Sequence, residues 1–279
     1  MTLLQIVVLA AVQGIAELLP VSSSAHVIAA ERLLGLDPAA PQMTFLLVML
    51  HTGTMFAVIG YFWRTWRERY FGSAAAFREN AKLVVVATAL TAAIGMALLV
   101  LIERVILRGS PHAEIEQLFG NPFVMAAGLA AAGVLILASG RREERDALRL
   151  DARRAAWIGA VQGLCLPFRG FSRSGATIST GVLLGVDRLR AEEFSFALAV
   201  VLTPAVVARE GWRLSKARAL AGHADLMAMF VPGLLGMACS FVAGWLALRL
   251  LSQWLENGRW GRFGYYCLAA AFALLLFGR

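Results

Sequence analysis

Long runs of apolar residues constrain the fold of this 279-residue chain more than any other feature. A helix needs roughly 20 apolar residues to cross the hydrocarbon core of a bilayer. Six segments meet or nearly meet this length: 43–63, 83–103, 121–139, 194–212, 226–251 and 262–278. Only 16% of the residues are charged, against about 25% in a soluble domain. Because open strands cannot satisfy their backbone in lipid, the sequence predicts an all-α polytopic membrane protein.

The net charge of +8 is explained by membrane topology rather than by a nucleic acid partner, and we expect no such partner. Basic residues cluster in the connections 64–82 and 140–154. Cytoplasmic loops carry such an excess of Lys and Arg, so we expect both loops in the cytoplasm and loop 104–120 outside. Loop 213–225, which this orientation places outside, is also basic and argues against it. No Lys or Arg precedes the apolar start at Leu3, so we expect this segment to be retained rather than cleaved as a signal peptide.

Two shorter apolar regions are interrupted by polar residues. Residues 3–19 and 25–35 flank Pro20 and a triple serine, and residues 155–166 and 175–186 flank a second polar interruption. A run of about 11 helical residues is only about 16 Å long and cannot cross a bilayer alone. Each pair is therefore predicted to form a re-entrant helical hairpin.

The two interrupted regions resemble each other. Val12-Gln13-Gly14-Ile15 recurs about 149 positions later as Val161-Gln162-Gly163-Leu164, and Leu-Leu-Gly closes both regions. We expect a single membrane domain of two repeats, about 1–139 and about 155–279, joined by a cytoplasmic linker over about 140–154. Each repeat holds a hairpin and three spans, and because three is odd, the second copy enters the membrane inverted. Coincidence of short motifs is the alternative.

Polar side chains near the first interruption form a candidate functional site, because such groups are costly at membrane depth. They are Gln13, Glu17, Ser22, Ser23, Ser24 and His26. Gln13 and Glu17 share one helical face, and His26 follows Ser23 by three positions. Pro20 stops the first helix, and the N-terminus of the next helix offers unpaired N–H groups to an anion.

The second interruption repeats this arrangement with Ser172, Arg173, Ser174, Gly175 and Thr177. The guanidinium fork of Arg173 suits phosphate oxygens. If an inverted repeat brings both hairpin tips together, one pocket combines carboxylate, imidazole, hydroxyl and guanidinium groups. A divalent cation on Glu17 and an anionic substrate on Arg173 fit this set, which favours phosphoryl or diphosphate chemistry.

Each motif alone also has a structural explanation. A triple serine is more often a helix cap, a lone membrane histidine is more often a packing residue, and Arg173 could pair with a carbonyl or a lipid headgroup. His51, inside span 43–63, is a further candidate that would contact residues of the site rather than the substrate. The alternative class of protein is a transporter or flippase of a phosphorylated lipid, because inverted repeats around a midplane anion site are transporter architecture.

The two motifs resemble the signatures of the bacterial undecaprenyl-diphosphatase, or bacitracin-resistance, family. The first signature covers Val12–His26, the second covers Gly170–Ser179, and the likeness continues through Glu193–Phe196 and nearly the whole chain. The resemblance implies hydrolysis of the terminal phosphate of undecaprenyl diphosphate, with Mg²⁺ or Ca²⁺ as cofactor. It implies recycling of the lipid carrier for peptidoglycan synthesis in the bacterial inner membrane, and bacitracin resistance. We expect a site open to the periplasm, a polyprenyl diphosphate and membrane lipids as partners, and a homodimer as a further candidate.

The resemblance also implies roles for individual residues. Glu17 matches the acidic metal-binding or acid/base residue, Ser23 the nucleophile or substrate-binding serine, His26 the essential histidine and Arg173 the diphosphate-binding arginine. The candidate substrate-binding residues are Gln13, Ser22, Ser24, Ser172, Ser174, Gly175 and Thr177. 

Two positions depart from the family pattern. Gln13 replaces the first acidic residue of the Glu-x-x-x-Glu pattern, which weakens a two-carboxylate metal site. Arg169 stands in an apparent one-residue insertion before the second motif and adds a cation next to the site.

Overall fold

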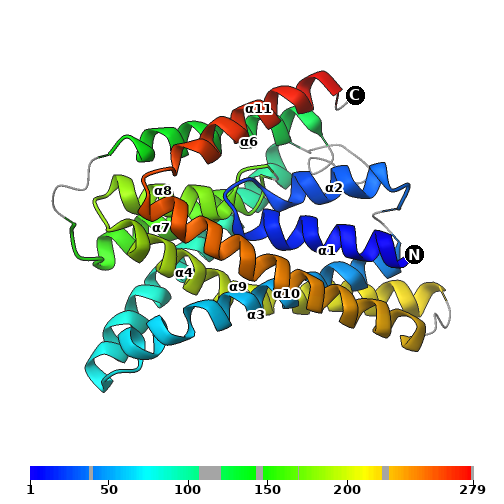
Figure 1. The fold of residues 1–279 in the computed structure, drawn as a ribbon, viewed down its shortest axis with the longest axis horizontal. Coiled ribbons are helices and arrows are strands. Elements are labelled where there is room, and N and C mark those ends of the chain that lie inside the picture. The colour runs from blue at the N-terminus through cyan, green and yellow to red at the C-terminus, as the bar shows by residue number, and fades with distance from the viewer. Residues whose placement is uncertain (38–39, 107–120, 143–146, 169, 222–225, 278–279) are drawn as a thin grey trace. The chain divides into compact units, whose positions relative to one another are not determined.

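The computed structural model describes residues 1–37, 40–106, 121–142, 147–168, 170–221 and 226–277 (Figure 1). Arg169 lies outside the described residues, as do parts of loops 104–120 and 140–154. Apart from one isolated bridge between Leu148 and Val186, every regular element in the described chain is a helix. The predicted all-helical class is confirmed.

The helices follow one another in a pattern of lengths that occurs twice. The first part of the chain forms α1 (Leu3–Leu18), α2 (Ser23–Leu33), α3 (Pro41–Tyr70), α4 (Ala74–Leu101), the π-helical η1 (Ile102–Ile106) and α6 (Pro122–Gly140). The second part forms α7 (Ala152–Cys165), α8 (Arg173–Leu183), α9 (Arg188–Ala221), α10 (Leu226–Glu256) and α11 (Gly261–Phe277). Without η1, the lengths are 16, 11, 30, 28 and 19 residues, then 14, 11, 34, 31 and 17.

Five described helices are long and apolar enough to cross a membrane. They are Gln42–Tyr70, Ala74–Arg104, Pro122–Gly140, Arg188–Ala208 and Phe230–Glu256. They match five of the six predicted spans, so the chain is a multi-pass membrane protein. The sixth predicted span, 262–278, forms the shorter apolar helix α11. Helix α9 continues to Ala221, because residues 213–221 contain no proline or glycine to end it; most of the predicted loop 213–225 is therefore helical.

Side-chain caps explain where several helices begin. The first free N–H groups of a helix need acceptors, and the capping oxygens come from Ser73 before α4, Asn121 before α6, Asp151 before α7 and Ser172 before α8. Helices α2 and α8 each end shortly before a glycine with positive φ, Gly35 at 65° and Gly185 at 86°. This left-handed conformation is the usual helix stop.

The chain divides into two compact units. Unit 1 consists of Met1–Leu18, Ser23–Arg64 and Ala199–Leu251. Unit 2 consists of Leu19–Ser22, Thr65–Leu198 and Ser252–Arg279. Helices α3, α9 and α10 contribute residues to both units.

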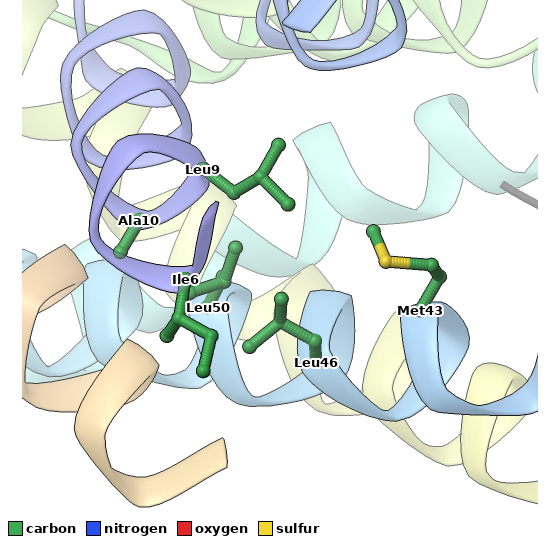
Figure 2. Close-up of a cluster of buried hydrophobic side chains, with 6 residues drawn as sticks. All are labelled: Ile6, Leu9, Ala10, Met43, Leu46 and Leu50. Atoms are coloured by element: carbon green, nitrogen blue, oxygen red, sulfur yellow. The ribbon is translucent and has the colours of Figure 1, made fainter. Parts of the chain in front are cut away.

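In unit 1, α1 packs on α3 through a buried apolar cluster. Figure 2 shows its six side chains: Ile6, Leu9 and Ala10 from α1, and Met43, Leu46 and Leu50 from α3. Each is at most 3% exposed. A second contact brings α1 close to α10, because a Cβ added at Gly14 would lie 2.8 Å from the carbonyl oxygen of Ser240. Between helices in a membrane, close van der Waals packing of such side chains holds α1 in unit 1.

In unit 2, glycines and a buried hydroxyl bring helices together. Gly159 of α7 lies so close to α4 that an added Cβ would overlap the carbonyl oxygen of Ala87. Thr91 Oγ1 donates to the carbonyl oxygen of Gly159 at 2.9 Å, and Gln162 Nε2 donates to Thr91 Oγ1 at 3.1 Å. Helices α6 and α11 lie side by side (Figure 1). Small residues and interhelical hydrogen bonds of this kind are typical of helix packing in membranes.

Candidate functional site

A short hydrogen bond joins the two ends of the first interrupted region within unit 1. Glu17 lies in the last turn of α1, and Ser23 is the first residue of α2. Ser23 Oγ donates to Glu17 Oε2 at 2.6 Å. This distance is in the range of O–H···O bonds to a charged acceptor. The pair has the spacing that a nucleophile and a general base require.

Two further side chains surround the same carboxylate. Gln13 is buried one turn earlier on α1, and its Nε2 donates to Glu17 Oε2 at 3.3 Å. His51 of α3 places Nε2 3.9 Å from Glu17 Oε2. Its other ring nitrogen, Nδ1, lies 2.8 Å from the carbonyl oxygen of Leu47. The structure therefore brings the candidates Gln13, Glu17, Ser23 and His51 together.

The backbone that carries these side chains is held by α10. Ser240 Oγ donates to the carbonyl oxygen of Leu50 at 2.9 Å, next to His51. The carbonyl oxygen of Ser240 contacts α1 at Gly14, next to Gln13. One residue of α10 thus fixes both α1 and α3 at the level of the carboxylate. A site on rigid helices keeps its geometry better than a site on loops.

The remaining candidates of the first region lie at the end of the bend between α1 and α2 and in the first turns of α2. Ser24 and His26 are half-buried in the first turns of α2, with His26 three positions after Ser23. Ser22 is buried and has a φ of 68°, the only positive value among the described residues other than glycine. Such a conformation is strained for serine and is typical of functional sites. It turns the chain from the bend into α2.

In unit 2, Arg173 is the first residue of α8. It is half-buried, and it follows the buried cap Ser172, whose Oγ accepts from the N–H of Gly175 at 3.2 Å. Gly170, with a φ of 101°, lies so close to Met125 that a Cβ would overlap its carbonyl oxygen. The α8 N-terminus and the guanidinium group together can bind an anion.

Two predicted substrate-binding residues of α8 make internal hydrogen bonds. Thr177 Oγ1 donates to the carbonyl oxygen of Arg173 at 2.8 Å and lies 2.6 Å from Ser195 Oγ. Ser174 Oγ donates to the carbonyl oxygen of Leu19 at 3.3 Å. Sequence reasoning did not assign a role to Ser195. Its signal in the sequence is a hydroxyl between two phenylalanines, Phe194 and Phe196, and the structure buries all three side chains.

The bend between α1 and α2 packs on the first turn of α8 within unit 2. Besides the bond from Ser174 to Leu19, a Cβ added at Gly175 would lie 3.2 Å from Pro20 Cβ. Cys267 Sγ of α11 also donates to the carbonyl oxygen of Pro20 at 3.1 Å. The bend Leu19–Ser22 is therefore anchored on the first turn of α8 and on α11.

The donor set limits how a metal could bind. No group of three or more His, Cys, Asp or Glu side chains suited to a metal occurs in the described part of the chain. Glu17 supplies the carboxylate of the unit 1 site, with amide and hydroxyl groups beside it. Mg²⁺ is commonly held by one or two carboxylates together with substrate phosphates. The residues thus fit a cation shared with a phosphorylated substrate rather than an all-protein metal site.

The fold and these side chains define a multi-pass helical membrane protein with a polar site suited to an anionic substrate. Residues 6–273 match the family described as bacitracin resistance protein BacA. The chain belongs to this family, which confirms the resemblance drawn from the two motifs.

Named relatives agree with this assignment. Undecaprenyl-diphosphatase 2 of Acinetobacter baylyi is 58% identical over 274 residues, covering 96% of this chain and 95% of the relative. The undecaprenyl-diphosphatase of Gluconobacter oxydans is 32% identical, covering 97% and 96%. That of Desulfosudis oleivorans is 34% identical, covering 95% and 94%. In each comparison the match covers at least 94% of both chains.

Proposed function

We propose that this chain is an integral membrane phosphatase that hydrolyses undecaprenyl diphosphate to undecaprenyl phosphate and inorganic phosphate. The reaction consumes one water and breaks the P–O bond between the two phosphates. The reaction would return the lipid carrier to peptidoglycan synthesis and would confer bacitracin resistance, which the family description names. The observation that carries the proposal is the 2.6 Å hydrogen bond from Ser23 to Glu17. A binding or transport site does not need such a pair.

We assign four residues to the reaction. Glu17 accepts the proton of the attacking hydroxyl, which belongs to Ser23 or to a water bound beside it. His26 is the second acid/base group, three positions after Ser23 on α2. Arg173 neutralises charge on the phosphate oxygens through its two parallel N–H groups. The set is completed by substrate-binding or supporting groups, which are Gln13, Ser22, Ser24, Ser172, Ser174, Gly175 and Thr177.

The two groups of residues are proposed to act on one diphosphate. The support comes from the sequence, in which the two motifs that carry these residues repeat each other, as the two halves of one site in an inverted repeat would. The long apolar chain of the substrate would lie along the membrane-spanning helices.

A divalent cation, Mg²⁺ or Ca²⁺, is proposed as cofactor. Glu17 would hold it together with the phosphate oxygens, with Gln13 as a neutral neighbour. When bound, the cation would offset the negative charge of the diphosphate. The cation held by Glu17 and the guanidinium group of Arg173 would then both offset the negative charge of the diphosphate.

We propose that the chain is an inverted repeat with two re-entrant hairpins. The repeated order of helix lengths supports two copies. So do two equivalent glycine contacts: an added Cβ would lie 2.8 Å from Ser240 O at Gly14, and 2.9 Å from Thr91 O at Gly163. Both the glycines and their partners are 149 positions apart. With loops 64–82 and 140–154 in the cytoplasm, the protein would lie in the bacterial inner membrane with its site open to the periplasm.

We also propose that the protein forms a homodimer, in which case the molecular mass of the purified protein is twice that of one chain.

Phosphate release by the purified protein in detergent tests the proposed function. We expect release of inorganic phosphate from undecaprenyl diphosphate, and we expect EDTA to abolish it and excess Mg²⁺ or Ca²⁺ to restore it. Release that persists in EDTA would remove the cation from the proposal. Movement of the lipid across vesicles without phosphate release would favour a transporter instead.

A further inference from the structure

The catalytic carboxylate needs a group that aims it at Ser23. Glu17 lies on α1 and Ser23 on α2, and the bend between them contains four residues, Leu19–Ser22. A glutamate side chain has three rotatable bonds, so its carboxylate can turn away from the hydroxyl. Nucleophile and base pairs are commonly completed by a third group that orients the base.

His51 occupies the place of such a third group. Its Nδ1 lies 2.8 Å from the carbonyl oxygen of Leu47. A carbonyl oxygen only accepts, so Nδ1 donates. This bond fixes the ring, and the opposite edge faces Glu17, with Nε2 3.9 Å from Oε2. The two groups attract each other as an ion pair when Nε2 also carries a hydrogen, because only the imidazolium form donates at both nitrogens. The ring is therefore held at one nitrogen by its own helix and faces the carboxylate with the other.

The helix that carries His51 cannot shift easily. Leu50 is fully buried, and its carbonyl oxygen accepts from Ser240 Oγ at 2.9 Å. Gly53 packs so tightly on α10 that an added Cβ would overlap the carbonyl oxygen of Met237. Since α10 also holds α1 at Gly14, the distance between His51 and Glu17 is set by packing on both sides.

We infer that His51 is a positioning residue that keeps the Glu17 carboxylate directed at Ser23. The inference rests on the proposed function and deepens it, because it assigns a role to a side chain of α3 outside both sequence motifs. His51 acts through Glu17 and not on the substrate. Its loss is therefore expected to lower kcat and to leave KM nearly unchanged.

Two amide substitutions separate this role from a structural one. The amide nitrogen of His51→Asn can take the place of Nδ1 and keep the bond to Leu47. The amide nitrogen of His51→Gln can take the place of Nε2 and keep the contact with Glu17. His51→Leu removes both. Thr52→Val is the matched control, because Thr52 Oγ1 donates to the carbonyl oxygen of Val48 in the same helix at 2.8 Å.

The test measures kcat and KM for undecaprenyl diphosphate, and the thermal unfolding midpoint, of wild type and all four variants in detergent. We expect kcat to fall on the order of 10-fold in His51→Leu and His51→Asn, with KM within about twofold. We expect His51→Gln to retain most of the wild-type kcat and Thr52→Val to match wild type.

The inference is overturned if His51→Asn is as active as His51→Gln, since the bond to Leu47 would then be sufficient. It is also overturned if His51→Leu and Thr52→Val have equal kcat. The comparison of His51→Asn with His51→Gln tests the inference even if His51→Leu does not fold. A wild-type protein that releases no phosphate would refute the proposed function itself, and the inference with it. An active wild type with an unaffected His51→Leu would refute the inference alone.

Discussion

The hydrogen bond between Ser23 and Glu17 makes the proposed activity depend on one carboxylate. Glu17→Gln keeps the shape of the side chain but removes the proton acceptor and the negative charge. We expect the protein to stay folded and kcat to fall on the order of 100-fold or more, as for loss of a general base. Glu79→Gln is the control, because Glu79 forms a surface pair with Arg149, and such pairs contribute little. Wild-type turnover of Glu17→Gln at saturating Mg²⁺ would contradict the role of Glu17.

Substitution of Arg173 tests whether its side chain, at the N-terminus of α8, contributes to substrate binding or to the chemical step. Lysine keeps the charge but cannot bind two phosphate oxygens in parallel. We expect Arg173→Lys to lower kcat and kcat/KM together, on the order of 100-fold, by analogy with loss of one preorganised charge-stabilising donor. A rise in KM alone would assign Arg173 to ground-state binding. A folded Arg173→Lys protein with wild-type kcat and KM would refute its role in the reaction.

At the scale of the helices, the close contact of α7 with α4 leaves no space for a side chain at Gly159. An added Cβ there would overlap the carbonyl oxygen of Ala87, so α7 must move away from α4. We expect Gly159→Ala to lower stability by about 1–3 kcal/mol, as overpacking does, and thus to lower the thermal unfolding midpoint. Gly211→Ala in α9 is the control, since nothing lies within 4 Å of its added Cβ. Equal midpoints for the two variants would contradict the packing of α4 on α7.

The helices themselves were largely predictable because apolar length is a local property of the sequence. Five of the six predicted spans are helices of spanning length, and the two interruptions lie where α1 and α7 end. The extension of α9 to Ala221 differs from the predicted loop 213–225, because charged residues can continue a helix as well as form a loop. A charged side chain does not by itself end a helix, since Lys and Arg are good helix formers.

The composition of the site was also predictable, but its contacts were not. Polar groups in apolar runs identified Glu17, Ser23 and Arg173. The bond from Ser174 to the carbonyl oxygen of Leu19, however, joins residues 155 positions apart, and the pairing of Thr177 with Ser195 requires α8 and α9 to meet. Such contacts follow from tertiary packing, which periodicity along one helix does not contain.

At the scale of the whole molecule, the proposed inverted repeat predicts which loops share a side of the membrane. With loops 64–82 and 140–154 in the cytoplasm and 104–120 outside, a membrane-impermeant thiol reagent added outside should label single cysteines in 104–120 and none in the two basic loops. The background variant must first lose the native free cysteines Cys165, Cys239 and Cys267. Labelling of either basic loop from outside would contradict the orientation and the proposed periplasmic opening.

The central claim is that this chain breaks the bond between the two phosphates of a polyprenyl diphosphate by means of Glu17 and its partners. The most direct measurement follows lipid and phosphate together: purified wild type and Glu17→Gln are incubated with undecaprenyl diphosphate, and both products are quantified by mass spectrometry and phosphate assay. We predict one inorganic phosphate and one undecaprenyl phosphate for each substrate consumed by wild type, and almost no turnover by Glu17→Gln. Intact undecaprenyl diphosphate after incubation with folded wild type and a divalent cation, or equal turnover by both proteins, would contradict the claim.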